Sequence, residues 1–370
     1  MILISTQCFP PDIGGIENLL GGVAERLSQE GFQVNVFADG KKKKDDVERA
    51  FQIIRFSAPK PIRRLLKSHA IRKFIKKNIP LNDQNSSLVF DSWKSLEFVG
   101  RLNIRKICFA HGNELLSEFG SKKWIRINKA LKAADLIIAN SNFTAKLLTS
   151  YEIDHSRVEV FYPPINPQPQ PDNNAVHWIE TQTAKRYPTL TTVCRLEPRK
   201  GIDSVITSLP KLINIFPNLL YLIGGEGGDR PRLENIIKNL NLASHVKLLG
   251  RLSEQERAAL LSKTSVFIMP TRKVGSSVEG FGISYVEAGW YGVPSIASQT
   301  GGGVEAVIND VTGLIVDLTK EDELTTAIKR VLEDSDLRNR LGEAAQKRSR
   351  GELCWDTAIN KLIKLIKNIS

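Results

Sequence analysis

The stretch "MILISTQCFPPDIGGIENLLGGVAERLSQEGFQVNVFA", Met1 to Ala38, carries the pattern that decides the fold. An apolar run at residues 1–6 is followed by a glycine-bearing turn, a segment with helical periodicity at residues 16–31, and a second apolar run at residues 33–38. Strand, helix and strand in this order indicate a parallel βαβ unit. The stretch therefore predicts an α/β protein.

The same alternation continues through the rest of the chain. Further apolar runs that end in small or polar residues lie at residues 86–92, 105–112, 135–141, 189–196, 218–225, 245–250, 265–270, 293–298 and 312–317. Near-continuous apolar runs are typical of parallel strands buried on both faces, and open sheets of this kind bind ligands at the carboxyl ends of their strands. We predict two doubly wound, Rossmann-like domains.

The boundary between the domains is expected at "PPINPQPQPDNN", residues 163–174, which is too rich in Pro and Asn for a helix or a strand. We place the first domain at residues 1–165, a linker at 166–185 and the second domain at 186–355. Residues 356–370 are expected to form an amphipathic helix that packs back toward the first domain.

The chain is basic, with 52 Lys and Arg against 40 Asp and Glu among 370 residues. The net charge of +12 implies an anionic partner, but it does not distinguish nucleic acid, phospholipid and a phosphorylated substrate. Residues 60–77, "KPIRRLLKSHAIRKFIKK", hold eight basic residues and no acidic one. Such a segment suits an anionic membrane surface or, equally, a solvated surface helix. No nucleic-acid module is recognisable, so nucleic acid is not an expected partner.

The cysteines indicate the compartment. Cys8, Cys108, Cys194 and Cys354 are scattered and form no CxxC pair, which argues against a disulfide framework and against a structural zinc site. No window approaches 18 uninterrupted apolar residues. We expect a cytoplasmic protein.

Two loops of the second half carry candidate ligand-binding groups. In "VCRLEPRKGIDS" Arg195 and Lys200 follow a strand, and two cations at a strand's carboxyl end suit a diphosphate, although they are also ordinary surface charges. In "YLIGGEGGDRPRL" Gly225 and Gly227 are followed by Arg230 where a dinucleotide fingerprint has its third glycine, so a nicotinamide site is not expected. These glycines indicate a tight turn at the edge of a nucleotide site.

The first half offers a glycine turn and a histidine. Gly14 and Gly15 directly precede a predicted helix, whose first amides suit an anion. His111 follows an apolar strand, where a lone histidine is more often structural than catalytic.

The segment "VEGFGISYVEAGWYGVPSIAS", residues 278–298, places two carboxylates eight positions apart. Glu279 precedes a helix expected to begin near Gly282, and Glu287 lies inside it. Continued over both residues, helical geometry leaves them about 80° apart, which suits two successive parts of one elongated ligand. The amides of Phe281 to Ile283 suit its anionic middle.

Taken in order, "FPPDIGGIE", "AHGNE", "CRLEPRKGID", "MPTRKVGSSVEGFGISYVEA" and "YGVPSIASQTGGGVEAV" resemble the motifs of the retaining GT-B glycosyltransferases of family four. Within that family the chain looks most like the GDP-mannose-dependent mannosyltransferases that build phosphatidylinositol mannosides. The resemblance implies a GT-B fold, in which two Rossmann-like domains face each other across a cleft. It spans nearly the whole chain.

The resemblance also implies roles for single residues. Arg195 and Lys200 bind the donor phosphates, Glu279 contacts the hexose, Glu287 contacts the ribose, and His111 contacts the hexose near its 6-hydroxyl. Arg195, Lys200, His111 and Glu279 form the expected catalytic group. The expected donor-binding residues are Gly14, Gly15, Arg195, Lys200, Gly225, Arg251, Glu279, Gly280, Phe281, Gly282, Ile283 and Glu287.

The implied reaction moves a hexose, with mannose favoured, from a nucleotide-diphosphate sugar to a lipid-linked or glycan acceptor in cell-envelope glycan synthesis. GDP-mannose is the favoured donor and a UDP-sugar the other candidate. Retention by front-face attack needs no carboxylate nucleophile. We expect neither cofactor nor metal, since the only Asp-x-Asp, Asp334 to Asp336, lies between helical runs and suits helix capping. The implied location is cytoplasmic, at the inner face of the membrane.

The sequence departs from the family's motifs at two places, and two alternative functions remain open. Cys194 replaces the small residue usual before the arginine, and "PPIN" replaces the usual linker sequence, which puts linker geometry and acceptor choice in doubt. One alternative is a nucleotide-sugar 2-epimerase, against which the two spaced glutamates argue. The other is a non-catalytic, basic membrane-binding protein.

Overall fold

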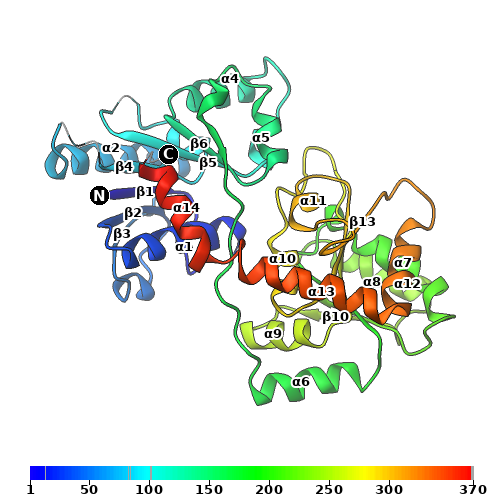
Figure 1. Ribbon diagram of the computed structural model, residues 1–370. Coiled ribbons are helices and arrows are strands. Elements are labelled where there is room, and N and C mark those ends of the chain that lie inside the picture. The colour runs from blue at the N-terminus through cyan, green and yellow to red at the C-terminus, as the bar shows by residue number, and fades with distance from the viewer. Residues whose placement is uncertain (13, 82, 84, 101, 368–370) are drawn as a thin grey trace. The chain divides into compact units, whose positions relative to one another are not determined.

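The computed structural model describes residues 1–12, 14–81, 83, 85–100 and 102–367. The chain folds into two compact units (Figure 1). Unit 1 comprises Met1–Asn166 together with Trp355–Ser370, and unit 2 comprises Pro167–Cys354. In the part of the chain that is described, no helix is both long and apolar enough to span a membrane.

Unit 1 is built on a seven-stranded sheet with the order β3-β2-β1-β4-β5-β6-β7 and parallel pairing throughout. Its strands are β1 (Ile2–Thr6), β2 (Val34–Asp39), β3 (Gln52–Phe56), β4 (Ser87–Phe90), β5 (Arg105–Ala110), β6 (Leu136–Ala139) and β7 (Val158–Val160). Strand β1 pairs with β2 on one side and β4 on the other, with Ile2 opposite Val34 and Ser87. The chain order reverses there, and ligands of open α/β sheets bind at such a switch point.

Helices cover both faces of this sheet. The helical segments of unit 1 are α1 (Gly15–Gln29), η1 (Lys44–Val47), α2 (Lys60–Asn78), α3 (Trp93–Leu96), η2 (Asn113–Leu115), α4 (Lys122–Lys132), α5 (Asn142–Leu148), η3 (His155–Arg157) and α14 (Trp355–Lys367). Successive strand side chains point to opposite faces, so Ile2 and Ile4 pack with α1 and α14, while Leu3 packs with α2 and α3. Two separate apolar cores result.

Helix α14 returns to unit 1 and lies beside α1 (Figure 1). Its fully buried Leu362 joins the core of that face. The two helices approach closely because Gly22 has no side chain: a Cβ there would lie 2.4 Å from Nε1 of Trp355. Arg26 adds an ion pair with Asp356 at 2.8 Å. Of the helix expected at 356–370, residues 368–370 lie outside the described residues.

Unit 2 holds a six-stranded parallel sheet with the order β10-β9-β8-β11-β12-β13. Its strands are β8 (Thr189–Val193), β9 (Leu220–Gly224), β10 (Val246–Gly250), β11 (Val266–Met269), β12 (Ser295–Ser298) and β13 (Gly313–Val316). Its helical segments are α6 (Asn173–Thr183), η4 (Pro198–Lys200), α7 (Ile202–Ile213), α8 (Arg230–Asn239), α9 (Glu254–Ser262), α10 (Ile283–Trp290), α11 (Gly303–Ala306), α12 (Glu323–Glu333) and α13 (Ser335–Arg350). The order reverses at β8, whose neighbours are β9 and β11.

The predicted fold class is confirmed, since both units are Rossmann-like parallel sheets with helices. Every apolar run that was read as a strand forms one. Strands β3 and β7 were missed, and both are edge strands without a buried residue. The cleft that the resemblance implies between the domains stays a prediction.

The region expected as a linker differs from the prediction. Residues 173–183 form α6, which starts where the Asp172 carboxylate accepts a hydrogen bond from the amide of Ala175 at 2.8 Å. Ala175 and Ile179 are buried against Leu220 and Leu222 of β9. Asp and Asn therefore act as a helix start here, where composition alone suggested irregular chain.

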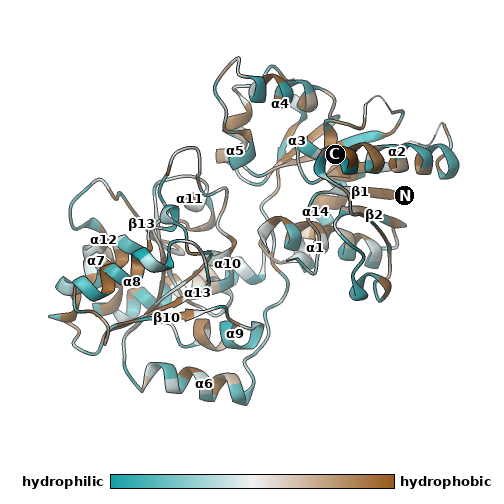
Figure 2. Ribbon diagram, turned by 180° about the vertical axis from the view of Figure 1, so that it is seen from behind, coloured by the Kyte–Doolittle hydropathy of each residue, from teal (hydrophilic) through white to brown (hydrophobic). Residues whose placement is uncertain are grey.

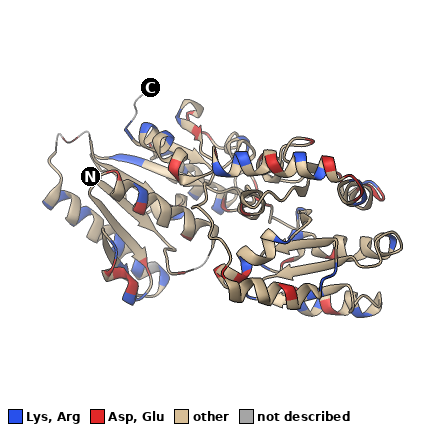
Figure 3. Ribbon diagram, turned by 60° about the horizontal axis from the view of Figure 1, so that its bottom comes forward, with Lys and Arg blue, Asp and Glu red and all other residues tan. Residues whose placement is uncertain are grey.

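Hydropathy and charge are distributed over the helices as expected for elements that pack on a sheet and face solvent. Figure 2 shows hydrophobic and hydrophilic bands alternating along α2, as expected for a helix that packs on a sheet. Figure 3 shows Lys and Arg on elements of both units, with Asp and Glu among them.

Replacing Leu362 with Ala should lower the free energy of unfolding by about 2–5 kcal/mol, because a fully buried side chain is removed from the α1–α14 core. The matched change Lys364→Ala, at an exposed position of the same helix, should stay within about 0.5 kcal/mol of wild type. Denaturant unfolding measures both. Equal stabilities for the two variants would mean that α14 is not part of the core.

Candidate functional site

The loop after β8 carries the cations of the candidate site. It is held by the glycine turn after β9, because the amide of Cys194 donates to Gly224 at 3.0 Å. A Cβ on Gly225, whose φ is +127°, would lie 1.9 Å from the carbonyl oxygen of Cys194, and one on Gly227 would lie 2.2 Å from that of Leu196. The backbone of the glycine turn therefore packs directly on the backbone of the loop after β8. These glycines support the cationic loop, which accounts for the incomplete dinucleotide fingerprint.

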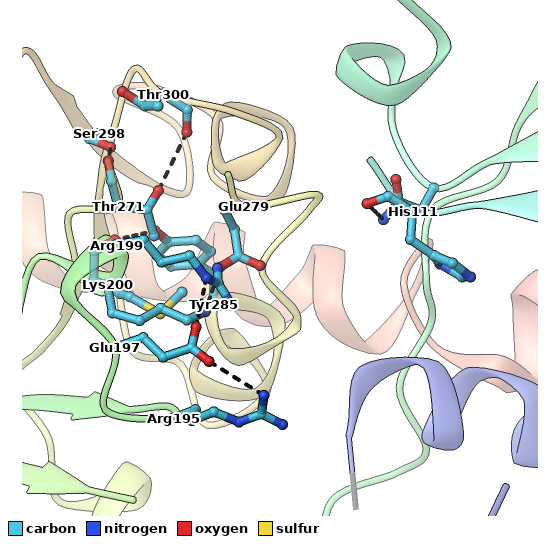
Figure 4. A network of polar contacts seen from close by, with 12 residues as sticks. His111, Arg195, Glu197, Arg199, Lys200, Thr271, Glu279, Tyr285, Ser298 and Thr300 are labelled. Atoms are coloured by element: carbon cyan, nitrogen blue, oxygen red, sulfur yellow. Dashed lines mark hydrogen bonds and ion pairs between the residues drawn. The ribbon is translucent and has the colours of Figure 1, made fainter. Parts of the chain in front are cut away.

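Five charged side chains form one network at this loop (Figure 4). Lys200 donates to Oε2 of Glu279, and Nη1 of Arg199 donates to the same oxygen at 2.8 Å. Nε of Arg199 also donates to Glu197 at 2.7 Å, and Nη1 of Arg195 lies 3.3 Å from the other oxygen of Glu197. Cations and carboxylates alternate along the network, which contains three cations and two carboxylates.

The two cations predicted from sequence have different environments. The side chain of Arg195 is 69% exposed, whereas that of Lys200 is 9% exposed and pairs with Glu279. The prediction missed Arg199, which links the two carboxylates. A signal was present, since "EPRK" places alternating charges between the two predicted positions. The site therefore has one accessible and two largely enclosed cations.

Glu279 is held as a carboxylate. Burial by itself raises the pKa of Glu279. The nearby Lys200 and Arg199 together lower the pKa by more than burial raises it, so it lies below its ordinary value. Its loop is fixed from the other side, because the amide of Gly302 donates to the Glu279 carbonyl at 2.9 Å. A Cβ on Gly302 would lie 1.9 Å from the carbonyl oxygen of Gly280. The glycine-rich turn after β12 thus supports the carboxylate.

The angle expected between Glu279 and Glu287 is wrong. Helix α10 begins at Ile283, after Gly282 with a φ of +94°, so Glu279 is not part of a continuous helix with Glu287. Glu287 meets Arg257 of α9 at 3.2 Å instead. Burial raises its pKa, against the opposing effect of Arg257. The two carboxylates have separate cationic partners, and their sugar and ribose roles stay predictions.

The other residues predicted for unit 2 are distributed around these loops. Phe281 is buried, and Ile283 is the first residue of α10. Arg251 is exposed directly after β10, and within the described part of the chain it has no hydrogen-bond or ion-pair partner. It is a further cation at the carboxyl edge of the sheet.

His111 lies in unit 1, at the carboxyl end of β5. Its Nε2 is 2.7 Å from the carbonyl oxygen of Asp91, and since a carbonyl only accepts, Nε2 carries the hydrogen. The other ring nitrogen, Nδ1, has no hydrogen-bond partner among the described residues. The backbone amide of His111 donates to Glu114 at 2.6 Å. The amide and Nε2 of His111 thus hold the residue in place, and Nδ1 is available to a ligand hydroxyl.

The turn before α1 is less specific than expected. Gly14 has an extended backbone, with a φ of 170°, which any residue adopts. A Cβ there would meet the carboxylate of Glu17, the end of a flexible side chain, and Gly15 is exposed. An anion-binding role for these glycines stays a prediction.

Within the described residues no group of three or more His, Cys, Asp or Glu side chains is placed to hold a metal ion. Asp334 caps α13 and accepts a hydrogen bond from the amide of Leu337 at 2.8 Å, so the capping interpretation of the Asp-x-Asp is confirmed. Cys8, Cys108, Cys194 and Cys354 form no disulfide in the described structure.

Two family models match the chain in succession. The model described as Glycosyltransferase Family 4 matches residues 13–169, and the model described as Glycosyl transferases group 1 matches residues 178–348. Together they extend over most of the chain.

Several relatives and solved structures are similar along the whole chain. The GDP-mannose-dependent alpha-(1-6)-phosphatidylinositol monomannoside mannosyltransferase of Mycobacterium tuberculosis is 28% identical over 99% of this chain and 98% of its own. The GDP-mannose-dependent monoacylated alpha-(1-6)-phosphatidylinositol monomannoside mannosyltransferase of Corynebacterium glutamicum is 27% identical over 99% and 97%. The structure of HepE of Anabaena in complex with UDP has a TM-score of 0.80 at 20% identity, covering 100% of both chains, and shows the shared fold.

The Glu279 network predicts a pH dependence of stability. Because the folded-state pKa of Glu279 is depressed, its stabilisation is complete above the ordinary value of 4.5 and is lost as the pH falls through the lower folded-state pKa. The difference in unfolding free energy between wild type and Glu279→Gln should therefore shrink as the pH is lowered from about 6 to about 3. Glu343→Gln, at an exposed position of α13, is the matched control. A difference that stays constant over this range would contradict the network.

Proposed function

Because this chain belongs to the GT-B glycosyltransferases, we propose that it transfers mannose from GDP-mannose to a lipid-linked acceptor at the inner face of the membrane, with retention of configuration. The observation that carries the proposal is the Arg195–Glu197–Arg199–Glu279–Lys200 network at the carboxyl edge of the unit 2 sheet. The full-length similarity to two GDP-mannose-dependent mannosyltransferases supports the choice of donor and acceptor.

The cations stabilise the leaving group. Breaking a sugar-diphosphate bond places negative charge on the departing phosphate, and fixed cations near it stabilise the transition state more than the ground state. Lys200 and Arg199 are held by Glu279 before the donor binds, so little reorganisation is needed. The exposed Arg195 completes the contacts to the diphosphate.

The carboxylates orient the donor and do not attack it. In front-face transfer the departing phosphate accepts the proton of the acceptor hydroxyl, so no carboxylate nucleophile is needed. Glu279 is engaged by two cations, which makes it a poor nucleophile and a rigid contact for the hexose. Glu287 contacts the ribose, and Nδ1 of His111 accepts a hydrogen bond from the hexose near its 6-hydroxyl.

The neutralisation of the diphosphate is proposed to need no metal. Three cations at one strand end supply the positive charge that a divalent ion provides in other transferases. Full GDP binding and turnover in the presence of EDTA support this part of the proposal, and loss of either in EDTA contradicts it.

The single changes Lys200→Ala and Arg195→Ala should each lower the turnover of GDP-mannose by roughly 10²-fold or more, since each removes one preorganised charge-stabilising group. Lys211→Ala is the control, because Lys211 is an exposed cation of α7 that pairs with Asp322. Mannosyl transfer to lipid extracts measures the effect. Activities of both variants within threefold of wild type would remove the proposed clamp.

Membrane attachment is proposed to involve α2. Its side chains Ile62, Leu65 and Leu66 are half or more exposed, with Leu65 at 60%. Not all eight cations of the segment are available to a membrane, because Lys67 is buried and donates to Asp39 at 2.7 Å, and Arg63 pairs with the same carboxylate. The remaining exposed cations include Lys73, Lys76 and Lys77 at the other end of the helix.

Liposome co-sedimentation tests this attachment. Wild type should bind vesicles with anionic lipid, and binding should fall with salt, because each cation near the surface contributes about 1 kcal/mol. A variant with Lys73, Lys76 and Lys77 changed to Gln should bind clearly less. The same change at Lys41, Lys42 and Lys44, another exposed basic run, is the control. Equal sedimentation of both triple variants would assign α2 an ordinary surface role.

A further inference from the structure

Unit 1 contains a pocket at its topological switch point. The pocket is partly open to solvent and lies where the carboxyl end of β1 meets α2 and α3. Its polar lining consists of Ser5, Gln7, Arg64, Lys67, Lys94 and Ser95, with Ser68 beside them. No acidic residue lines it. The residues come from three separate segments of the chain, so the pocket is a product of the fold.

Three cations of the pocket are incompletely neutralised. Lys67 is buried and donates to the Thr6 carbonyl and to Asp39, both at 2.7 Å, which leaves one of its three hydrogens. Arg64 lies over the ring of Phe98, and within the described residues it has no carboxylate partner. The same holds for Lys94 in the described part of the chain. Among the described residues, Asp39 is the one carboxylate that pairs with any of these three cations, and it is shared between Lys67 and Arg63.

Three buried polar atoms of the same lining have no hydrogen-bond partner among the described residues. They are Oγ of Ser5, Nε2 of Gln7 and Oγ of Ser95, and the two serines are more than nine-tenths buried. Buried polar atoms are nearly always paired, so an unpaired group indicates a missing partner. Of the seven buried side-chain atoms that lack a hydrogen-bond partner among the described residues, these three line one pocket.

The donor pattern selects the chemistry of that partner. Nε2 of Gln7 and the cations only donate, and serine hydroxyls donate as readily as they accept. A neutral hydroxyl or amide ligand would leave the positive charge unbalanced. A phosphate group is anionic and presents several acceptor oxygens in a compact tetrahedron, which matches donors that come from three segments of the chain.

We infer that this pocket binds a phosphate group, and that in the working enzyme this is the phosphodiester of the lipid acceptor. The assignment to the lipid acceptor rests on the proposed function. The pocket and His111 share an anchor, because Asp91 accepts from the amide of Gln7 at 2.7 Å and its carbonyl accepts from His111. A headgroup held by its phosphate in the pocket thus lies next to the loop that positions the residue predicted to contact the hexose.

Calorimetric titration with glycerophosphoinositol, inorganic phosphate and free inositol tests the inference on the full chain. Wild type should bind the glycerophosphodiester and not inositol. Arg64→Gln combined with Lys94→Gln should weaken diester binding at least tenfold and leave GDP binding unchanged. Lys41→Gln combined with Lys42→Gln makes the same change in net charge away from the pocket and should bind the diester within twofold of wild type.

A second variant separates binding from folding. Ser95→Ala removes an unpaired hydroxyl, so it should not lower the melting temperature, and it should weaken diester binding several-fold. A lower melting temperature with unchanged diester binding would show that Ser95 is structural and would overturn its role in the pocket.

The remaining outcomes distinguish the phosphate site itself from its assignment to the lipid headgroup. Diester binding unaffected by the Arg64/Lys94 variant would overturn the phosphate site. Binding of inorganic phosphate but not of the diester would keep the site and overturn the headgroup assignment. Diester binding that depends on Arg64 and Lys94, in a protein that transfers sugar from no donor, would uphold the phosphate site while the proposed function fails.

Discussion

The ion pair between Lys200 and Glu279 is the interaction on which the rest of the candidate site depends. It joins the loop after β8 to the loop before α10, two segments almost 80 residues apart in the chain. Both charges are largely enclosed, and removing one partner of such a pair costs about 3–5 kcal/mol because the other is left buried and unpaired. The pair therefore fixes the position of the two loops and holds the charges that the chemistry uses.

Glycines make this arrangement sterically possible. Gly225 and Gly302 each place backbone within van der Waals distance of the loop that carries a charged residue, and a side chain at either position would collide with a carbonyl oxygen. The glycine-rich stretches of unit 2 thus act as supports for charged loops. Their resemblance to nucleotide-binding turns reflects the need for close backbone approach, which both arrangements share.

The sequence predicted the features that depend on periodicity and failed where tertiary contacts decide. Buried strands read as apolar runs, whereas the short edge strands β3 and β7 hold no fully buried residue and were missed. Arg195 and Lys200 were found as cations after a strand and Glu279 as a carboxylate before a helix, but only the fold brings Arg199 between two carboxylates. Likewise, the composition of the basic segment of α2 did not indicate that Asp39, distant in sequence, binds two of its cations.

The most direct test of the central claim is a structure of the protein with GDP-mannose bound. The account predicts diphosphate oxygens within hydrogen-bonding distance of Lys200 and Arg195, with Glu279 contacting the mannose and no metal ion between protein and phosphates. A diphosphate bound away from this loop, with Lys200 paired to Glu279 alone, would contradict it.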